Sequence, residues 1–472
     1  NFAITGSSGD DDFSYAASNV TAADSLNGGG GTDQVTLTGG GSADISNFTA
    51  IDEIALAAAT TLTGGALNTS ITGSADTDQF IYQDSLFGSA DSIDAGAGDD
   101  ELVIIDGDSN GTSLDLTNAS NFENITFSTV GGGSTVGLSI NNGFVDGSND
   151  NNNIDIDLNN KNATLETTGL NGGNTVTLYS DGGVIVTLSG AGNTGVVTSD
   201  TFNSTIYVSS GNDQVTGGTG ADSFVVTDSD YLTTADSLVG GGTAIDTITI
   251  NDTATAGTTI ASGVFDDDGT NGGVSGFEVI NIGALAGGQL NIEITDLTAS
   301  NGNAATLNIA AADDIAQLTT TGLTGTLTIN SADDTFSAAL ADGVAHQGIT
   351  IADGETATIT LGNLGNTING GTGNETFIVT DDEIATTDSV AAGTGTDTLQ
   401  VVNNNGAVAG ASLANLTGFD IIDFNGSRTS GFVVSDDFVN NSDNDVITIT
   451  GSDIDDLDTS GVNALRQVII GT

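Results

Sequence analysis

The chain has almost no positive charge. Its 472 residues contain 3 Lys and Arg together against 63 Asp and Glu, a formal net charge of -60. Nucleic-acid binding needs cations to meet phosphates, so no nucleic-acid partner is expected. The same deficit disfavours docking on anionic lipid. Such a charge opposes compaction by self-repulsion, which bound divalent cations would relieve.

Cysteine, proline, methionine and tryptophan are absent. Without Cys the chain has neither disulfides nor thiolate sites. Without Pro it must turn through its 68 Gly and its Asn and Asp residues, which are typical of tight turns between strands. No apolar run approaches the roughly 20 residues of a membrane helix, so direct membrane insertion is not expected.

The chain contains one module four times. Its first half reads GSSGDDDF from Gly6, GSADTDQF from Gly73, GGTGADSF from Gly217 and GGTGNETF from Gly370. An Asp-Ser pair follows, then a second Gly-rich acidic turn, and then a third element that carries an acid before an apolar strand. This repetition divides the chain into modules at residues 1–70, 71–207, 208–365 and 366–472, of which the second and third include strand-rich inserts.

The inserts predict an all-β fold. Segments such as TLNIA, GTLTI and ATITL alternate apolar and polar residues over about five positions and then break at Gly, Asn or Asp. Short rungs, dense Gly and Asp turns and few large aromatics favour a β-solenoid, a parallel β-helix-like array. Tandem β-sandwich domains are the alternative.

One stretch carries a family resemblance. Gly217–Val225, GGTGADSFV, fits Gly-Gly-x-Gly-x-Asp-x-apolar-x at every fixed position, and VSSGNDQVT precedes it as a looser copy. This resembles the RTX family of secreted calcium-binding repeat proteins. The resemblance extends over about half of the chain. It implies that Ca²⁺ is held between Gly-rich turns stacked on one side of the rungs.

The repeated acids are the candidate calcium ligands, because Ca²⁺ takes six to eight oxygens from carboxylates and carbonyls. The acids of the two turns are 22 residues apart in the first, second and fourth modules. In the third module they are 24 residues apart. We expect each pair to flank one ion, with an intervening rung looped out. Asx hydrogen bonds that cap the turns are the alternative. The candidates are the turn pairs Asp11 and Asp33, Asp78 and Asp100, Asp222 and Asp246, and Glu375 and Asp397, the Asp-Ser acids Asp24, Asp91, Asp236 and Asp388, and the weaker Asp213.

Two further sets of residues receive plainer interpretations. The third-element acids Asp52, Glu123, Glu278 and Asp420 are expected on exposed strand faces. His346 is the only His, so it cannot build a zinc site of several His or Cys, and it is expected in a turn. No catalytic residue is assigned, and the chain is not expected to be an enzyme.

The predicted function is structural. The composition also resembles that of bacterial S-layer proteins and large surface adhesins, which implies secretion and assembly outside the cell. The expected role is Ca²⁺-dependent self-assembly into a cell-surface layer or filament, with copies of itself as partner and a cell-surface polysaccharide as a further candidate. A calcium-stiffened adhesin stalk is the alternative, and a polysaccharide-active β-helix enzyme is the least favoured.

Overall fold

The structure is a computed structural model that divides into two compact units, Asn1–Phe224 and Val225–Thr472. It describes residues 1–471 except 65–68, 85–91, 106–111, 129–134, 142–143, 146–152, 160–161, 168–174, 181–184, 190–194, 199–200, 202, 253–257, 261–263, 266–272, 286–288, 294–303, 310–313, 320–325, 332–334, 341–345, 363–364, 381–387, 403–412, 414, 426–431, 441, 443–444, 452–456 and 465.

The strands of the first unit form four sheets, here named A to D. Sheet A contains β1 (Ala3–Thr5), β3 (Ser25–Asn27) and β6 (Phe48–Thr49). Sheet B contains β2 (Asp12–Ala16), β4 (Gln34–Thr38), β7 (Glu53–Leu56), β9 (Ser70–Thr72), β11 (Ser92–Asp94) and β14 (Ala119–Ser120). Sheet C contains β5 (Gly41–Asp44), β8 (Thr60–Thr63), β10 (Gln79–Gln83), β12 (Glu101–Ile105), β15 (Asn124–Ser128), β17 (Asn153–Asp157), β19 (Thr175–Tyr179), β21 (Val196–Thr198) and β23 (Gln214–Thr216). Sheet D contains β13 (Thr112–Asp115), β16 (Thr135–Ser139), β18 (Asn162–Glu166), β20 (Ile185–Ser189) and β22 (Thr205–Val208).

The second unit has the same architecture, and its sheets are named E to H. Sheet E pairs β25 (Ser237–Val239) with β28 (Gly273–Ser275). Sheet F contains β26 (Thr247–Asp252), β29 (Val279–Leu285), β31 (Ala304–Ile309), β33 (Thr326–Ser331), β35 (His346–Ile351), β37 (Asn366–Asn369), β39 (Ser389–Ala391) and β41 (Leu416–Thr417). Sheet G contains β27 (Thr258–Thr259), β30 (Gln289–Glu293), β32 (Asp314–Thr319), β34 (Thr335–Leu340), β36 (Thr356–Thr360), β38 (Thr376–Thr380), β40 (Thr398–Val402), β42 (Ile421–Asn425), β44 (Val446–Gly451) and β46 (Gln467–Ile470). Sheet H pairs β43 (Phe432–Val433) with β45 (Leu457–Asp458), and β24 (Ser223–Val226) crosses the boundary between the units.

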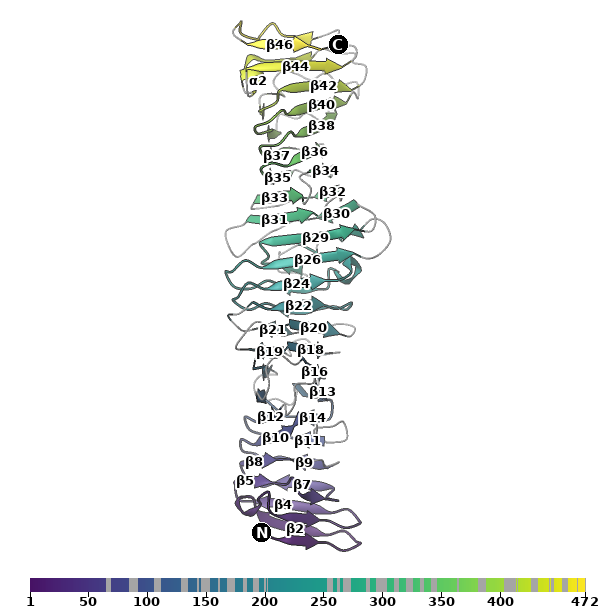
Figure 1. The fold of residues 1–472 in the computed structure, drawn as a ribbon, viewed down its shortest axis with the longest axis vertical. Helices are drawn as coiled ribbons and strands as arrows, with labels where there is room; N and C mark the ends of the chain where they lie inside the picture. Colours follow the sequence, from purple (N-terminus) through teal and green to yellow (C-terminus); the bar gives the residue numbers. More distant parts are fainter. Residues whose placement is uncertain are drawn as a thin grey trace. The chain divides into compact units, whose positions relative to one another are not determined.

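Within each unit the chain alternates between sheets and adds one strand to each as it goes round (Figure 1). Every strand pairing described within the units is parallel, as between β10 and β12 or between β38 and β40. Stacked parallel rungs of this kind form a β-solenoid. The predicted fold is therefore confirmed, and the alternative of tandem β-sandwiches, which pair antiparallel, is wrong.

The 22-residue spacing of the turn acids is one circuit of the solenoid. Gln79 pairs with Glu101, and Thr376 pairs with Thr398. Between β10 and β12, the described residues form one strand, β11, which belongs to sheet B. Acids 22 residues apart consequently lie on adjacent rungs, and the predicted looped-out rung between them is wrong.

The pair of sheets in use changes along the first unit. The first module begins in sheets A and B with β1 and β2, whereas the second begins in sheets B and C with β9 and β10. From β15 onward the chain alternates mainly between sheets C and D. Near each change a rung carries a third strand, such as β5 or β13. Corresponding strands of successive modules therefore lie in different sheets.

The core follows the alternation of the strands, whose inward residues are apolar and buried. The repeated Phe residues Phe80 and Phe377 are fully buried. Each contacts the Phe of its module's third element edge to face, with ring centroids 5.4 Å apart for Phe80 and Phe122 and 5.6 Å apart for Phe377 and Phe419. Two modules in different units thus share one packing arrangement.

Helical structure is minor. The described helical segments include the 3₁₀ turns η1 (Ala17–Asn19) and η3 (Ser229–Tyr231) and the helix α2 (Asp436–Asn440). None of the helices in the described ranges has the length and hydropathy needed to span a membrane. His346 begins β35, so the expectation that it lies in a turn is wrong.

Candidate metal centre in the acidic turns

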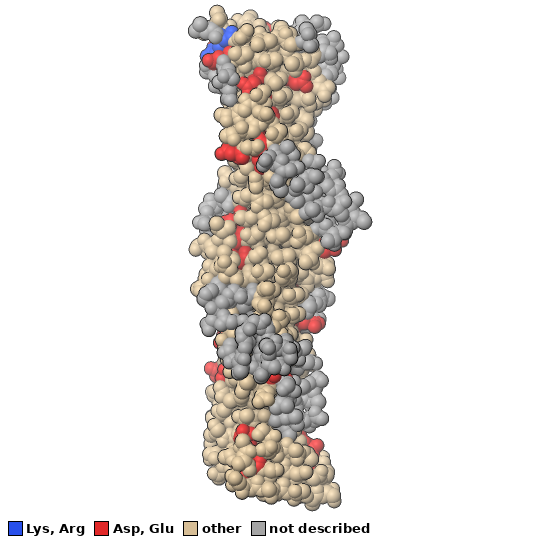
Figure 2. Space-filling model, in the orientation of Figure 1, with Lys and Arg blue, Asp and Glu red and all other residues tan. Residues whose placement is uncertain are grey.

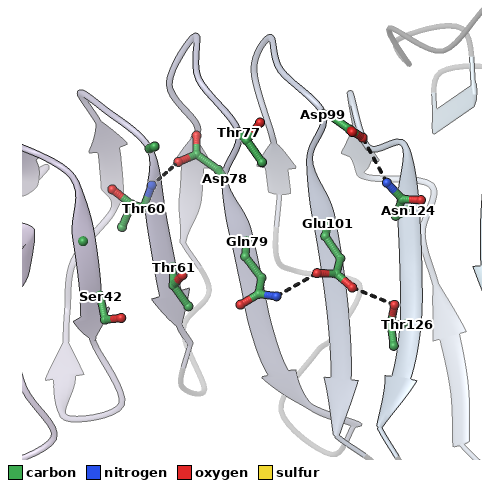
Figure 3. A pocket seen from close by; sticks show the side chains of 12 residues that line it. Ser42, Thr60, Thr61, Thr77, Asp78, Gln79, Asp99, Glu101, Asn124 and Thr126 are labelled. Atoms are coloured by element: carbon green, nitrogen blue, oxygen red, sulfur yellow. Dashed lines mark hydrogen bonds between the residues drawn. The ribbon is translucent and has the colours of Figure 1, made fainter.

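The acids of the Gly-rich turns hold each rung to the rung before it. Where the first module meets the second, Thr60 N–H donates to Asp78 Oδ1 (drawn in Figure 3). Within the second module, Asp78 N–H donates to Asp100 Oδ1 and Asp100 N–H to Glu123 Oε2; all three bonds are 2.6 Å long. Each carboxylate accepts a backbone N–H from one rung earlier. We call this arrangement the carboxylate ladder.

The carboxylate ladder recurs in the other modules with the same direction. In the first unit it comprises Asp11 N to Asp33 (2.9 Å), Asp33 N to Asp52 (2.8 Å) and Ser204 N to Asp222 (2.8 Å). In the second unit it comprises Asp246 N to Glu278 (2.7 Å), Ser331 N to Glu355 (3.0 Å), Glu375 N to Asp397 (2.8 Å) and Asp397 N to Asp420 (3.2 Å).

The same acids also close their own turns. Asp78 Oδ2 accepts the N–H of Ser74, four residues earlier, at 2.7 Å and the Ser74 hydroxyl at 2.9 Å. Asp11 accepts Ser7 N–H at 2.6 Å, and Asp213 accepts Ser209 N–H at 2.8 Å. Both carboxylate oxygens of Asp78 are thus engaged by backbone donors, as the Asx alternative predicts.

The Asp-Ser acids make similar bonds elsewhere in the rung. Asp24 accepts the N–H groups of Phe2 (2.6 Å) and Thr21 (2.9 Å), and Asp388 accepts Asn366 N–H at 2.9 Å. These donors favour the ionised form, so the N–H bonds from Thr21 and Phe2 lower the pKa of Asp24 to about 2. Asp236 accepts Thr233 N–H at 2.6 Å, and Asp91 lies outside the described residues.

Most of the predicted ligands are buried. Figure 2 shows Asp and Glu as separate patches on a largely uncharged face. Of the predicted set, Asp11 is partly exposed. The buried members are Asp24, Asp33, Asp78, Asp100, Asp213, Asp222, Asp236, Asp246, Glu375, Asp388 and Asp397.

Two of these buried acids keep oxygens that the carboxylate ladder does not use. Within the described residues, Asp100 Oδ2 has no hydrogen-bond partner. The buried Glu375 carboxyl shares a hydrogen bond with the Asp397 carboxyl and accepts one from Gly371 N–H. Burial raises the pKa of Asp100 to about 7, and the neighbouring charges of Asp78 and Glu123 add to the effect. Burial likewise raises the pKa of Glu375 to about 8, with the adjacent Asp397 carboxyl contributing. Both sites therefore favour either a proton or a cation.

The surroundings of these oxygens offer further hard ligands. A Cβ at Gly98 would lie 2.8 Å from the Asp76 carbonyl oxygen and 3.0 Å from Asp100 Oδ1. A Cβ at Gly373 would lie 3.0 Å from Glu375 Oε1. The glycines thus let backbone carbonyl oxygens of the preceding rung, from Asp76 and Glu355, approach the turns closely. Carbonyl and carboxylate oxygens are the ligands that Ca²⁺ prefers.

The acids do not converge in larger groups. Across the described ranges, no three His, Cys, Asp or Glu side chains gather as a metal-binding cluster. An ion at Asp100 or Glu375 would therefore need carbonyl oxygens and water to complete its shell. Asp222 belongs to the first unit and Asp246 to the second. The calcium site expected between these two acids therefore stays a prediction.

The third-element acids belong to the carboxylate ladder, which the sequence interpretation missed. Glu123 and Glu278 are 4% and 8% exposed, so their expected placement on exposed strand faces is wrong. Glu355, buried on the ladder, was not a candidate at all. These ladder acids share a sequence signal: each lies two residues before the first inward-facing apolar residue of its strand, as in Glu123-x-Ile125 and Glu355-x-Ala357.

The chain was compared with models of protein families, with curated proteins and with solved structures, and nothing matches it in any of the three comparisons.

Proposed function

We propose that this chain is an extracellular structural protein whose stacked rungs are stabilised by Ca²⁺ and which self-assembles into a cell-surface layer or filament. The observation that carries the proposal is the buried carboxylate ladder. Each module uses repeated acids to join one rung to the next, including Asp100, whose second oxygen is buried without a hydrogen-bond partner among the described residues. Such sites are costly as bare charges and favourable with a cation.

Asp100 and Glu375 are the residues that would hold the ions. Bound Ca²⁺ would supply positive charge that neutralises buried carboxylates and orders the Gly-rich turns. The chain itself would supply the rest of the stability, through parallel backbone pairing along each sheet and an apolar interior. Neutralisation would also reduce the self-repulsion of a chain with net charge -60.

Electron microscopy of the purified chain with calcium and with chelator tests the proposal. Ordered sheets or filaments should form with calcium and disperse when the chelator is added. A well-folded monomer that calcium stiffens without any array would favour the adhesin-stalk alternative. Arrays that persist unchanged after calcium removal would contradict the proposed dependence on the metal.

A further inference from the structure

A polar groove crosses the outer face of sheet C in the first unit (Figure 3). It has a volume of about 650 Å³ and extends over β5, β8, β10, β12 and β15. Apart from Gly41 and Ala59, every residue that lines it has a side chain that can form hydrogen bonds. Asp78 of the carboxylate ladder contributes to its lining, whereas Asp100, which is proposed to hold calcium, does not.

The strand register places one polar side chain per strand in a single row along the groove. Ser42 pairs with Thr61, Thr61 with Gln79, Gln79 with Glu101, and Glu101 with Asn124. Neighbouring strands of a sheet are about 4.8 Å apart. The row therefore presents hydrogen-bonding groups at a regular interval, which suits a ligand that is itself extended and periodic.

The centre of the row is held in place by its own hydrogen bonds. Gln79 Nε2 donates to Glu101 Oε2, and Thr126 Oγ1 donates to Glu101 Oε1, each over 2.7 Å. A carboxylate has about four acceptor sites, so Glu101 retains lone pairs, and Gln79 retains its carbonyl oxygen. The groove is thus organised before any ligand arrives, which reduces the entropy lost on binding.

The lining chemistry restricts the class of ligand. Asp99 and Glu101 lie in the groove and would repel an anionic chain. A peptide would seek an unpaired strand edge, but β8, β10 and β12 are paired on both sides. A neutral sugar chain carries donors and acceptors along its length, and a pyranose unit advances it by nearly one strand spacing.

We propose that this groove binds a neutral oligosaccharide that lies across the strands. Binding uses the outer face of one unit and does not rest on calcium or on assembly. Because the lining offers no aromatic platform, affinity comes from hydrogen bonds in competition with water. A dissociation constant in the millimolar range is expected for one groove.

The test is titration of the full chain with cellohexaose, maltohexaose and mannohexaose, read by ligand-observed NMR, with oligogalacturonate as the anionic comparison. At least one neutral hexasaccharide should bind, and oligogalacturonate should not. Gln79→Leu removes a member of the row, and Thr126→Val removes the hydroxyl that positions Glu101, so each should weaken binding at least tenfold. Both side chains are on an outer strand face, and circular dichroism checks that each variant folds.

The second unit supplies matched controls. Gln400 Nε2 donates to Asp423 at 3.0 Å and Thr450 Oγ1 donates to Asp423 at 2.8 Å, but the apolar Ile378 pairs with Gln400 in that row. Gln400→Leu and Thr450→Val should leave binding unchanged. The proposal is overturned if no neutral hexasaccharide binds, if oligogalacturonate binds better, or if the control variants weaken binding as much as the groove variants do.

Discussion

At the scale of single residues, the repeated acids differ in how fully their oxygens are used. Asp78 is bonded through both oxygens, whereas Asp100, one rung further on, has an oxygen without a partner among the described residues. The same residue type at equivalent positions can therefore serve two roles. Asp78 organises backbone, and Asp100 combines that role with a buried charge that needs compensation.

Replacing each of these acids by Asn separates the two roles. In chelator at pH 8, Asp78→Asn should lower the free energy of unfolding by about 1–3 kcal/mol, because the new amide would face backbone donors. Asp100→Asn can keep the acceptor for Asp78 N–H and removes a buried charge, so stability should be unchanged or raised. Urea unfolding followed by circular dichroism measures both. Equal destabilisation by the two variants would contradict the assignment.

The raised pKa of Glu375 predicts that stability depends on pH. The ordinary value is 4.5 and the folded value is about 8, so the folded state holds the proton more tightly. The stabilising contribution is complete below pH 4.5 and is lost as pH rises toward 8. In calcium-free buffer, the urea midpoint of the second unit should fall over this range.

Asp24 acts in the opposite direction: its pKa is lowered to about 2, so its contribution to stability is present above pH 3.8 and lost below it.

Glu375→Gln is the control for the Glu375 titration, since a glutamine does not ionise and should flatten the dependence of stability on pH. An unchanged slope between pH 4.5 and 8 in Glu375→Gln would refute the role assigned to Glu375.

At the scale of elements, the turns set how closely successive rungs approach. Gly29 has a φ of +107°, and a Cβ there would lie 2.0 Å from the Ser7 carbonyl oxygen of the previous rung. Its neighbour Gly30 has no heavy atom nearer than 4.0 Å to such a Cβ. One turn thus contains a glycine that the stacking requires and another that it does not.

Alanine at these two positions should therefore have different effects. Gly29→Ala combines a strained φ with a backbone clash and should destabilise the first unit by more than about 1 kcal/mol. Gly30→Ala should change stability by less than about 0.5 kcal/mol. Amide hydrogen exchange in β2 and β4 reports the local loss. Comparable protection in both variants would be inconsistent with the close approach at Gly29.

Much of this element-level structure could be predicted. Alternating apolar residues and Gly-rich turns identified the rungs, and repetition identified the turn acids. The spacing of 22 residues was ambiguous, because it can arise from two short rungs with a loop or from one circuit with a strand in each of two sheets. Only the pairing of Gln79 with Glu101, a non-local backbone contact, distinguishes them.

The change of sheets between modules was also beyond a single sequence. It depends on rungs such as that of β5, where a third strand enters. Glu123 and Glu278 were misplaced because an acid beside a strand usually faces solvent. Their burial depends on a donor one rung earlier, Asp100 N–H for Glu123 and Asp246 N–H for Glu278. Those donors can be identified only after the register is known.

At the scale of the whole molecule, a chain with net charge -60 must fold against its own electrostatic repulsion. Backbone N–H groups stabilise many of the buried carboxylates, and protons or cations must balance the others. Calcium would then act as a folding ligand as well as an assembly signal. This coupling of folding to calcium can be measured on the isolated chain without any array.

The direct measurement is urea unfolding at pH 8 in calcium and in chelator, for the wild type and for Asp100→Asn with Glu375→Gln. One site at a calcium concentration a hundredfold above its dissociation constant adds about 2.7 kcal/mol. Calcium should therefore raise the wild-type unfolding free energy by at least that amount, and the double variant should lose most of the increase. Equal stability of the wild type in calcium and in chelator would contradict the account.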